Sequence, residues 1–253
     1  MTIAACYLSS EGVVFGADST TTMFVQGPGP NPIGADHHYN FAQKIFQIGD
    51  DDQSTLAITM WGLGSLGELS YRTLIAEFSD DLVARPVGTM ADVADRWNNT
   101  YWSAYSRQFG SIIAKARVLV GQGTRTPDEE TELSFLQQNF SGGFCLGGYR
   151  LPNRKPEAYE VVYQPSQAGP QAPQPLAIGT AKFWGCPNIM HRLLYGVDFG
   201  MLAAIESSPH WTGTQDDLVH LASPYLYCNR FLVTLLAGPY ILTCVEDTHA
   251  VGS

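Results

Sequence analysis

The sequence predicts an α+β fold in which two antiparallel β-sheets lie between pairs of helices, a four-layer αββα sandwich. Segments typical of strands and helices come in blocks along the 253 residues, in the order strands, two helices, strands, two helices, strands. A parallel, doubly wound sheet would need strands and helices that alternate one by one. Hydrophobic residues make up 45% of the chain and charged residues 15%, which predicts a large core. No repeat or linker divides the sequence, so we expect one domain over residues 1–253.

The first block of strands begins at residue 2. Residues 2–8 and 13–17 are apolar and flank the turn Ser-Ser-Glu-Gly, so a β-hairpin is expected. Residues 23–39 are rich in Gly and Pro and are expected to form a loop. Residues 44–48 and 55–61 predict two further strands.

Two helices are expected next. Apolar residues between Ser65 and Phe78 recur at helical spacing. Thr89, followed three residues later by Asp92, has the pattern of an acidic capping box at the start of a long helix. The aromatic stripe from Trp97 to Tyr105 predicts the face of that helix that lies in the core.

The second half of the chain returns to strands and helices. The segments GFCLGGY and EAYEVVY predict a pair of strands joined by RLPNRKP, and a loop rich in Pro and Gln follows. The remaining elements are expected to be a short strand at 176–179, helices at 187–199 and 214–227, and a closing hairpin of strands at 231–237 and 240–245.

The balance of charges argues against nucleic acid as a partner. The 14 Lys and Arg residues against 24 Asp and Glu residues give a formal net charge of −10, whereas nucleic-acid surfaces need clustered Lys and Arg. The low charged fraction favours some surface that is buried by self-association.

No membrane span or export signal is predicted. The longest uncharged apolar stretch, from Phe231 to Val245, is shorter than the roughly 17–25 residues of a spanning helix and contains Gly-Pro. The N-terminus MTIAACYL lacks a basic segment. Five widely spaced cysteines without a CxxC pair suggest reduced thiols, so we expect a cytoplasmic protein.

A GxGxxG pattern at Gly62, Gly64 and Gly67 raises nucleotide binding as a remote alternative. A strand precedes the pattern and a helix is expected to follow it, as in a dinucleotide-binding fingerprint. The acidic residue that should end a second parallel strand about 20 residues later is absent, because EFSDDLVARP reads as helix or loop. A tight turn between strand and helix is the favoured interpretation.

No metal site, cofactor site or conventional triad is predicted. Asp36-His37-His38 lies in the Gly- and Pro-rich segment without obvious further ligands, and the other histidines are scattered. The stretch Leu63-Gly64-Ser65-Leu66-Gly67 lacks the first glycine of a GxSxG nucleophile motif.

The N-terminus offers a different nucleophile. Thr2 is small, so removal of Met1 by an aminopeptidase is expected, which leaves Thr2 with a free α-amine beside its own hydroxyl. Because an α-amine titrates near about 7.7–8.0, it can act as general base for that hydroxyl at neutral pH. With Met1 retained, this mechanism is blocked.

Three further residues fit an acyl-transfer site around Thr2. Asp18 ends the strand expected to pair with that of Thr2, and Lys44 begins the next strand. A lysine paired with Asp18 sets a positive field, which lowers the pKa of the hydroxyl and favours a neutral amine. Gly62 follows a strand end, where its N–H can face a tetrahedral oxyanion.

The segments TIAACYLSSEGVVFGADSTTT, QKIFQIGDD and LAITMWGLGS resemble the proteasome β-subunit family of N-terminal-nucleophile (Ntn) hydrolases. The resemblance implies a mature chain that starts at the nucleophile Thr2. It further implies a catalytic Asp18 in the motif G-x-D, a catalytic Lys44 at the start of the third strand, and the oxyanion N–H at Gly62.

The segment GTAKFWGCPNIM is similar to the G-x-x-K-[YF]-G-x-P-I-[LM] segment of bacterial proteasome homologues of the Anbu or beta-proteobacterial type, with one extra residue. Many family members carry a serine just before the helix expected near Pro187, and an Asp and a Ser late in the chain. This sequence has neither that serine nor the late Asp. Cys186 and Ser223 are the candidates for supporting roles.

The resemblance implies a threonine-type peptidase, an amide hydrolase without a cofactor, that acts on peptides or proteins inside stacked homo-oligomeric rings. Thr22 is expected to bind peptide main chain, and Met60 to lie at a specificity pocket for modest apolar side chains. The missing serine and aspartate leave a second possibility open, a weakly active or inactive ring scaffold or small-amide hydrolase of the same fold. Neither the ring size nor an ATP-driven unfoldase partner follows from the sequence.

Overall fold

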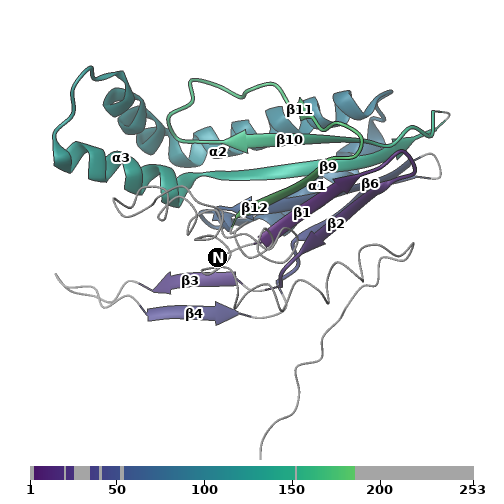
Figure 1. Cartoon of the computed structure of the whole chain (residues 1–253), viewed down its shortest axis with the longest axis horizontal. Coiled ribbons are helices and arrows are strands. Elements are labelled where there is room, and N and C mark those ends of the chain that lie inside the picture. The colour runs from purple at the N-terminus through teal and green to yellow at the C-terminus, as the bar shows by residue number, and fades with distance from the viewer. Residues whose placement is uncertain are drawn as a thin grey trace, which may run out of the picture. The chain divides into compact units, whose positions relative to one another are not determined.

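The computed structural model describes residues 3–19, 21–25, 35–39, 42–51, 54–151 and 153–185 (Figure 1). These residues belong to one unit, which ends at Gly185. The elements predicted between residues 187 and 245 lie outside the described residues, as do Thr2, Cys186 and Ser223. The single domain over residues 1–253 therefore stays a prediction.

The described part of the chain runs through strands, then helices, then strands again, as the order of blocks predicts. Its elements are β1 (Ile3–Leu8), β2 (Val13–Ala17), β3 (Thr21–Val25), β4 (Ala35–Tyr39), β5 (Ile45–Asp51), β6 (Ser54–Gly62), β7 (Ser65–Leu66), β8 (Leu69–Ser70), α1 (Tyr71–Ala84), α2 (Met90–Gly121), α3 (Pro127–Phe140), β9 (Gly142–Arg150), β10 (Glu157–Tyr163), β11 (Gln174–Pro175) and β12 (Ala181–Gly185).

The strands pair into two main sheets. A five-stranded sheet has the order β11-β10-β9-β6-β5, and a three-stranded sheet has the order β12-β1-β2. Every neighbouring pair in both sheets is antiparallel, so the prediction of an α+β fold built on antiparallel sheets is confirmed. Two short hairpins, β3-β4 and β7-β8, complete the described strands.

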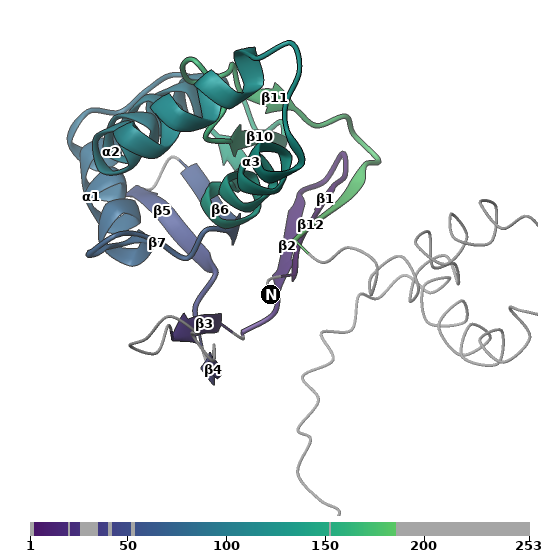
Figure 2. The same ribbon diagram turned by 90° about the vertical axis from the view of Figure 1, so that its left-hand side faces the viewer.

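The five-stranded sheet is covered on both faces. Successive side chains of a strand point to opposite faces, so Met60 of β6 packs in the core beneath α1 and α2 whereas Trp61 packs toward the three-stranded sheet. The buried residues of β1 (Ala4, Cys6 and Leu8) join Trp61 in this second core. Figure 2 shows α1 and α2 on one side of β5 and β6, and β1, β2 and β12 on the other. The described residues thus form three layers: helices, sheet, sheet.

The long helix α2 begins as predicted. Thr89 Oγ1 accepts a hydrogen bond from Asp92 N at 3.1 Å, and the Asp92 carboxylate accepts one from Thr89 N at 3.1 Å, so the capping box is complete. Trp97, Tyr101 and Tyr105 from the aromatic stripe are all 0% exposed. The stripe is therefore part of the core, as predicted.

A bend in α2 separates the part of the helix that covers the sheet from the part that contacts α3. Phe109 has non-helical angles (φ −113°, ψ 23°) and is followed by Gly110. Beyond the bend, Ala116 and Leu119 pack in a small separate cluster with Leu133 of α3. The sequence analysis missed α3 as a separate helix, although the segment TPDEE carries its signal, a Thr N-cap, a Pro in the first turn and a Glu at N3.

Two predicted boundaries were wrong because short β-hairpins were mistaken for other structure. The predicted loop at 23–39 contains strand residues at both ends, since β3 and β4 pair as a hairpin. The helix predicted from Ser65 begins only at Tyr71. The residues before it form the β7-β8 hairpin, in which Gly67 takes a φ of +64° that favours glycine.

The strand predicted at 176–179 was also misplaced. The nearby strands are β11, which ends at Pro175, and β12, which begins at Ala181. Gly179 has a φ of +85°, so the chain turns where the sequence analysis placed a strand.

None of the helices within the described residues combines the length and the apolar character that crossing a bilayer requires.

We expect the free energy of unfolding to fall above about pH 10. Burial raises the pKa of Tyr71, Tyr101 and Tyr163 well above the usual value. A raised folded-state pKa gives stability that is complete below the unfolded pKa of about 10 and is lost as pH rises above it. Urea unfolding followed from pH 8 upward should show this decline, and Tyr71→Phe should make it shallower. A constant midpoint through alkaline pH would contradict the expectation.

Candidate active site

The open end of the β1-β2 hairpin brings Ile3 and Asp18 together. Asp18 N donates to Ile3 O at 3.1 Å, and Ile3 N donates to the Asp18 carboxylate oxygen Oδ1 at 2.7 Å. Asp18 follows the last residue of β2, so the register of the hairpin (Ala4 opposite Ala17) fixes this contact. The Ile3 nitrogen belongs to the peptide bond that joins Ile3 to Thr2. Thr2 itself lies outside the described residues.

Lys44 reaches the same carboxylate oxygen from the other sheet. It lies just before β5 and is 6% exposed, and its Nζ is 2.7 Å from Asp18 Oδ1. The side chains of Lys44 and Asp18 are 5% and 26% exposed, so solvent screens the pair weakly. The contact links the end of the three-stranded sheet to the start of β5.

One oxygen atom therefore receives two donors. Asp18 Oδ1 accepts both the Ile3 peptide N–H and the Lys44 ammonium, which places the ammonium within two hydrogen bonds of the peptide group that follows Thr2. A fixed positive charge at this distance favours neutral amines and anionic oxygens in its surroundings. The structure thus brings together two of the residues predicted for catalysis, and it places them beside Ile3, which follows Thr2 in the sequence.

Gly62 lies at the end of β6 where β5 begins. Ile45 pairs with Thr59, so the last residues of β6 run alongside the chain just before β5, where Lys44 is located. Gly62 has a φ of +80°, and a Cβ built on it would be 2.5 Å from the carbonyl oxygen of Ser141. Both the backbone angle and the close approach of β9 require glycine here. Its role as oxyanion donor stays a prediction.

The two predicted substrate-binding residues lie on different strands. Met60 is 9% exposed and packs in the core beneath α1 and α2, so little of it faces solvent. Thr22 lies in β3 opposite His38 of β4. Neither position tests the predicted role.

The sequence analysis missed a pair of stacked tryptophans beside this site. The rings of Trp61 on β6 and Trp184 on β12 are 4.4 Å apart between centroids and inclined by 8°. Trp184 Nε1 donates to Glu160 Oε1 at 2.5 Å, and Lys182 pairs with the other oxygen of Glu160. The signal in the sequence is the repeated Trp-Gly at the ends of β6 and β12, where Gly62 and Gly185 both have positive φ.

The glycine pattern does not form a dinucleotide-binding turn. Gly62 ends β6, and Gly67 lies in the turn of the β7-β8 hairpin. Both neighbours of β6 in the sheet, β5 and β9, run antiparallel to it. The parallel strand-helix-strand unit of the fingerprint is therefore not built around these glycines.

Metal ligation and cysteine chemistry find no support in the part of the chain that the structure describes. Among its residues, no group of three His, Cys, Asp or Glu side chains could hold a metal ion. Cys6 and Cys145 are free and buried. Burial raises the pKa of the Cys145 thiol well above its usual value, so it is not an activated nucleophile.

Comparisons with protein-family models and with curated proteins find no match for the chain. Solved structures of Anbu proteins are similar at low identity. Anbu (ancestral beta-subunit) from Yersinia bercovieri is 13% identical with a TM-score of 0.44, over 81% of this chain and 72% of that one. The helical assembly of the Anbu complex from Pseudomonas aeruginosa is 15% identical with a TM-score of 0.45, over 94% and 76%. A Gly-1 mutant of Anbu from Hyphomicrobium sp. strain MC1 is 12% identical with a TM-score of 0.46, over 81% and 72%. Values this low establish no shared activity.

The Asp18–Lys44 pair should behave as a coupled unit in stability measurements. Asp18→Asn keeps an acceptor for Ile3 N but leaves the buried ammonium without this carboxylate, which we expect to cost about 3 kcal/mol. Lys44→Met removes the charge, and adding Asp18→Asn to it should cost much less than Asp18→Asn alone. Urea unfolding of the two single variants and the double variant measures the coupling. If the losses in the free energy of unfolding are additive, the two side chains are not coupled and the expectation is wrong.

Gly62→Ala should lower the free energy of unfolding more than is usual for a substitution at an exposed position. The new Cβ meets the Ser141 carbonyl oxygen at 2.5 Å, and φ of +80° is strained for alanine. We expect a loss of about 1–3 kcal/mol in the free energy of unfolding from this strain. Gly64→Ala is the matched control, because a Cβ at Gly64 meets nothing within 4 Å. Equal losses in thermal unfolding of both variants would be incompatible with this explanation.

Proposed function

We propose that the chain is an N-terminal threonine hydrolase that cleaves amide bonds of peptides or proteins after removal of Met1. Thr2 is the nucleophile, Asp18 and Lys44 set the field around it, and the Gly62 N–H stabilises the oxyanion. The observation that carries the proposal is the Asp18 oxygen that accepts both Lys44 Nζ and Ile3 N, each at 2.7 Å. It ties a buried ammonium to the first peptide group after Thr2.

The proposed reaction follows from these positions. Thr2 Oγ attacks the scissile carbonyl while its α-amine takes the hydroxyl proton, directly or through a water molecule. The negative charge that develops on the carbonyl oxygen is stabilised by the Gly62 N–H. Collapse of this intermediate expels the amine, to which the protonated α-amine gives its proton. Water then hydrolyses the ester on Thr2 by the same path in reverse.

Lys44 supports this chemistry by its charge and not by transferring the proton. Its side chain is 5% exposed and is held by Asp18. A cation so fixed favours the neutral form of the nearby α-amine, which is the form that a general base needs. Asp18 in turn offsets the cost of burying the ammonium and fixes the start of β1 through Ile3 N.

We assign substrate contacts to Thr22 and Met60. Thr22 binds the peptide main chain, and Met60, two residues before Gly62, lies at the pocket for modest apolar side chains. Met60 is 9% exposed, and a mostly buried methionine suits the floor of a small apolar pocket because its flexible thioether adapts to neighbouring groups.

The fourth layer of the sandwich and the ring assembly belong to the same proposal. The predicted helices at 187–199 and 214–227 are the second helix pair that a four-layer sandwich needs. The apolar outer face of the three-stranded sheet favours a further layer, since Tyr7 and Val14 pair across β1 and β2 and are 42% and 44% exposed. Self-association into stacked rings is supported by the low charged fraction of 15% and by the exposed Val118 and Phe135 on the helix layer.

A second function of another kind is a ring scaffold, or a small-amide hydrolase, with little peptidase activity. The missing serine before Pro187 and the missing late aspartate favour it, because a site with fewer proton-transfer groups turns over slowly. Nucleotide binding through Gly62, Gly64 and Gly67 is disfavoured by the antiparallel neighbours of β6. An unfolding temperature unchanged by millimolar dinucleotides ends that idea.

The test is reaction with a β-lactone, read by intact-protein mass spectrometry and peptide mapping. Attack of Thr2 Oγ opens the lactone and leaves an ester, so the mass rises by that of the whole reagent. We expect one adduct, located on Thr2, in chains that have lost Met1. Thr2→Ser should still be labelled and Thr2→Ala should not.

The outcomes separate the hypotheses. An adduct on Thr2 with hydrolysis of fluorogenic peptides supports the peptidase. An adduct on Thr2 without peptide hydrolysis supports the scaffold or small-amide hydrolase. No adduct on chains with Thr2 exposed would remove Thr2 as nucleophile, and chains that retain Met1 are to be treated with an aminopeptidase before labelling.

A further inference from the structure

The residues of the proposed active site come from two different sheets. Ile3 begins β1 and Asp18 directly follows β2 in the β12-β1-β2 sheet, whereas Gly62 ends β6 and Lys44 precedes β5 in the five-stranded sheet. Stacked sheets pack about 10 Å apart through side chains alone. The distance from the N-terminus of β1 to the Gly62 N–H therefore depends on the contacts that hold the two sheets in register.

The Trp61–Trp184 stack is an aromatic contact between the two sheets. The parallel rings, 4.4 Å apart and inclined by 8°, come one from each sheet. Both tryptophans are nearly buried, at 9% and 6% exposed. Two large rings in face-to-face contact resist sliding of one sheet over the other, since any shift loses contact area.

The Trp61 ring fits against β9 because the residue opposite it has no side chain. Its cross-strand partner is Gly143, and a Cβ at Gly143 would overlap the Trp61 ring. The indole therefore lies close to the backbone of β9 at Gly143 and stacks on Trp184.

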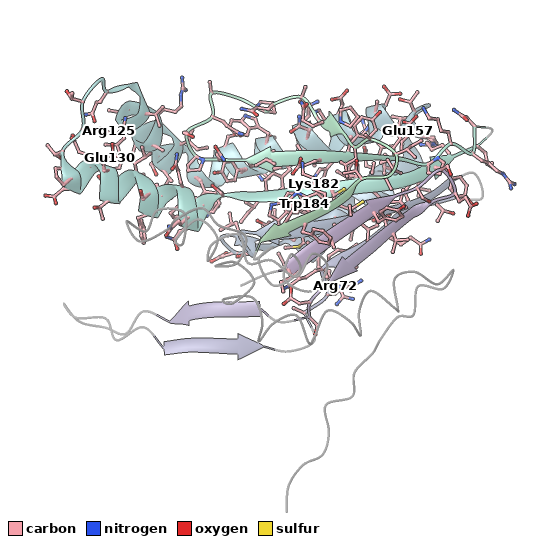
Figure 3. All side chains as sticks on the ribbon, in the orientation of Figure 1. Arg72, Arg125, Glu130, Glu157, Lys182 and Trp184 are labelled. Carbon is pink, nitrogen blue, oxygen red and sulfur yellow. The ribbon has the colours of Figure 1, made fainter. Side chains whose placement is uncertain are left out.

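Trp184 is held from the side by a carboxylate on β10. Glu160 Oε1 accepts from Trp184 Nε1 at 2.5 Å, and its other oxygen pairs with Lys182. Both Lys182 and Trp184 extend from β12 (Figure 3), and Lys182 Nζ is 6.0 Å from the centre of the Trp184 ring. The Glu160 side chain is only 11% exposed. An apolar contact would stabilise the sheets without the cost of burying a charge, whereas the hydrogen bond fixes the rotation of the indole.

Each tryptophan is one peptide bond away from a part of the site. Trp61 precedes Gly62, the proposed oxyanion donor. Trp184 precedes Gly185, which pairs with Ile3 at the start of β1. The stack thus joins the two backbone segments whose separation sets the distance between nucleophile and oxyanion donor.

We propose that Glu160, Trp184 and Trp61 are positioning residues for the hydrolase, which fix the Gly62 N–H relative to the N-terminus of β1. The inference rests on the proposed function and adds to it three residues that do not touch the substrate. Its consequence is kinetic: a shifted oxyanion donor weakens binding of the transition state and leaves binding of the ground state nearly unchanged.

The test measures acylation of the full chain by the β-lactone over a range of reagent concentrations. Loss of one oxyanion donor lowers rates by about a hundredfold or more, so partial displacement in Trp184→Ala should lower the maximal rate by about tenfold. The half-saturating concentration should change less than about twofold. Trp184→Phe keeps a stacked ring and should recover part of the rate. Glu160→Ala should also lower the maximal rate. Glu160→Gln keeps an acceptor for Trp184 Nε1 and should retain most of the maximal rate of the parent chain.

Leu8→Ala is the matched control. Leu8 is 1% exposed in the same core between the sheets, but it lies at the far end of β1, about 16 Å from Ile3 at roughly 3.3 Å per residue. It should lower the unfolding temperature and leave the maximal rate unchanged. Equal losses of the maximal rate in Leu8→Ala and Trp184→Ala would show that the stack acts only as core packing, which would overturn the proposal.

Failure of this inference differs from failure of the proposed function. If the parent chain forms no adduct on Thr2, the proposed function falls and the positioning role falls with it. If the parent chain is labelled and Trp184→Ala reacts at the same maximal rate, only the positioning role is overturned. Should Trp184→Ala fail to fold, Trp184→Phe and the Glu160 pair of variants decide, because they keep the volume or the acceptor.

Discussion

The contact between the Asp18 carboxylate and the Lys44 ammonium is the interaction on which the site depends. A lysine side chain that is 5% exposed needs a counter-charge, because an isolated buried ammonium is strongly disfavoured. Asp18 supplies that charge from the other sheet, and the same oxygen accepts Ile3 N. Compensation of this buried charge holds the start of β1 near the start of β5. The Trp61–Trp184 stack adds a second contact between the two sheets.

The contact between the two sheets changes character along its length. At the far end of β1, Leu8 contributes ordinary apolar burial. Toward the site, Ala4 and Gly143 are small, and the space that they leave is filled by the two indole rings. Glu160 then introduces a nearly buried carboxylate with an indole N–H and an ammonium as partners. Specific geometry is thus concentrated at the end where residues from the two sheets must meet.

Local signals in the sequence predicted much of the described structure. The β1-β2 hairpin follows from its turn, and its register places Asp18 beside Ile3. The capping box at Thr89 marked the start of α2 correctly. The helix predicted from Ser65 failed because apolar residues of a short hairpin fall at spacings that also fit a helix. Only the pairing of β7 with β8 decides between the two.

Contacts between residues distant in sequence could not be predicted in the same way. The pairing of β12 with β1 joins opposite ends of the described chain, and no local pattern encodes its register. The Trp61–Trp184 stack depends on that pairing and so escaped the sequence analysis. The resemblance to a family supplied the residues predicted for catalysis, but it did not point to Trp61 or Trp184.

The fit of Trp61 over Gly143 has a consequence for how this sequence can change over generations. A side chain at Gly143 has no room while the indole is present, and a smaller residue at Trp61 would leave a hole above the glycine. Neither position can vary alone without loss of packing, yet a joint replacement can restore it. Among related chains these two positions should therefore be exchanged together, and a lineage that has lost the tryptophan should be recognisable by a larger residue at the glycine.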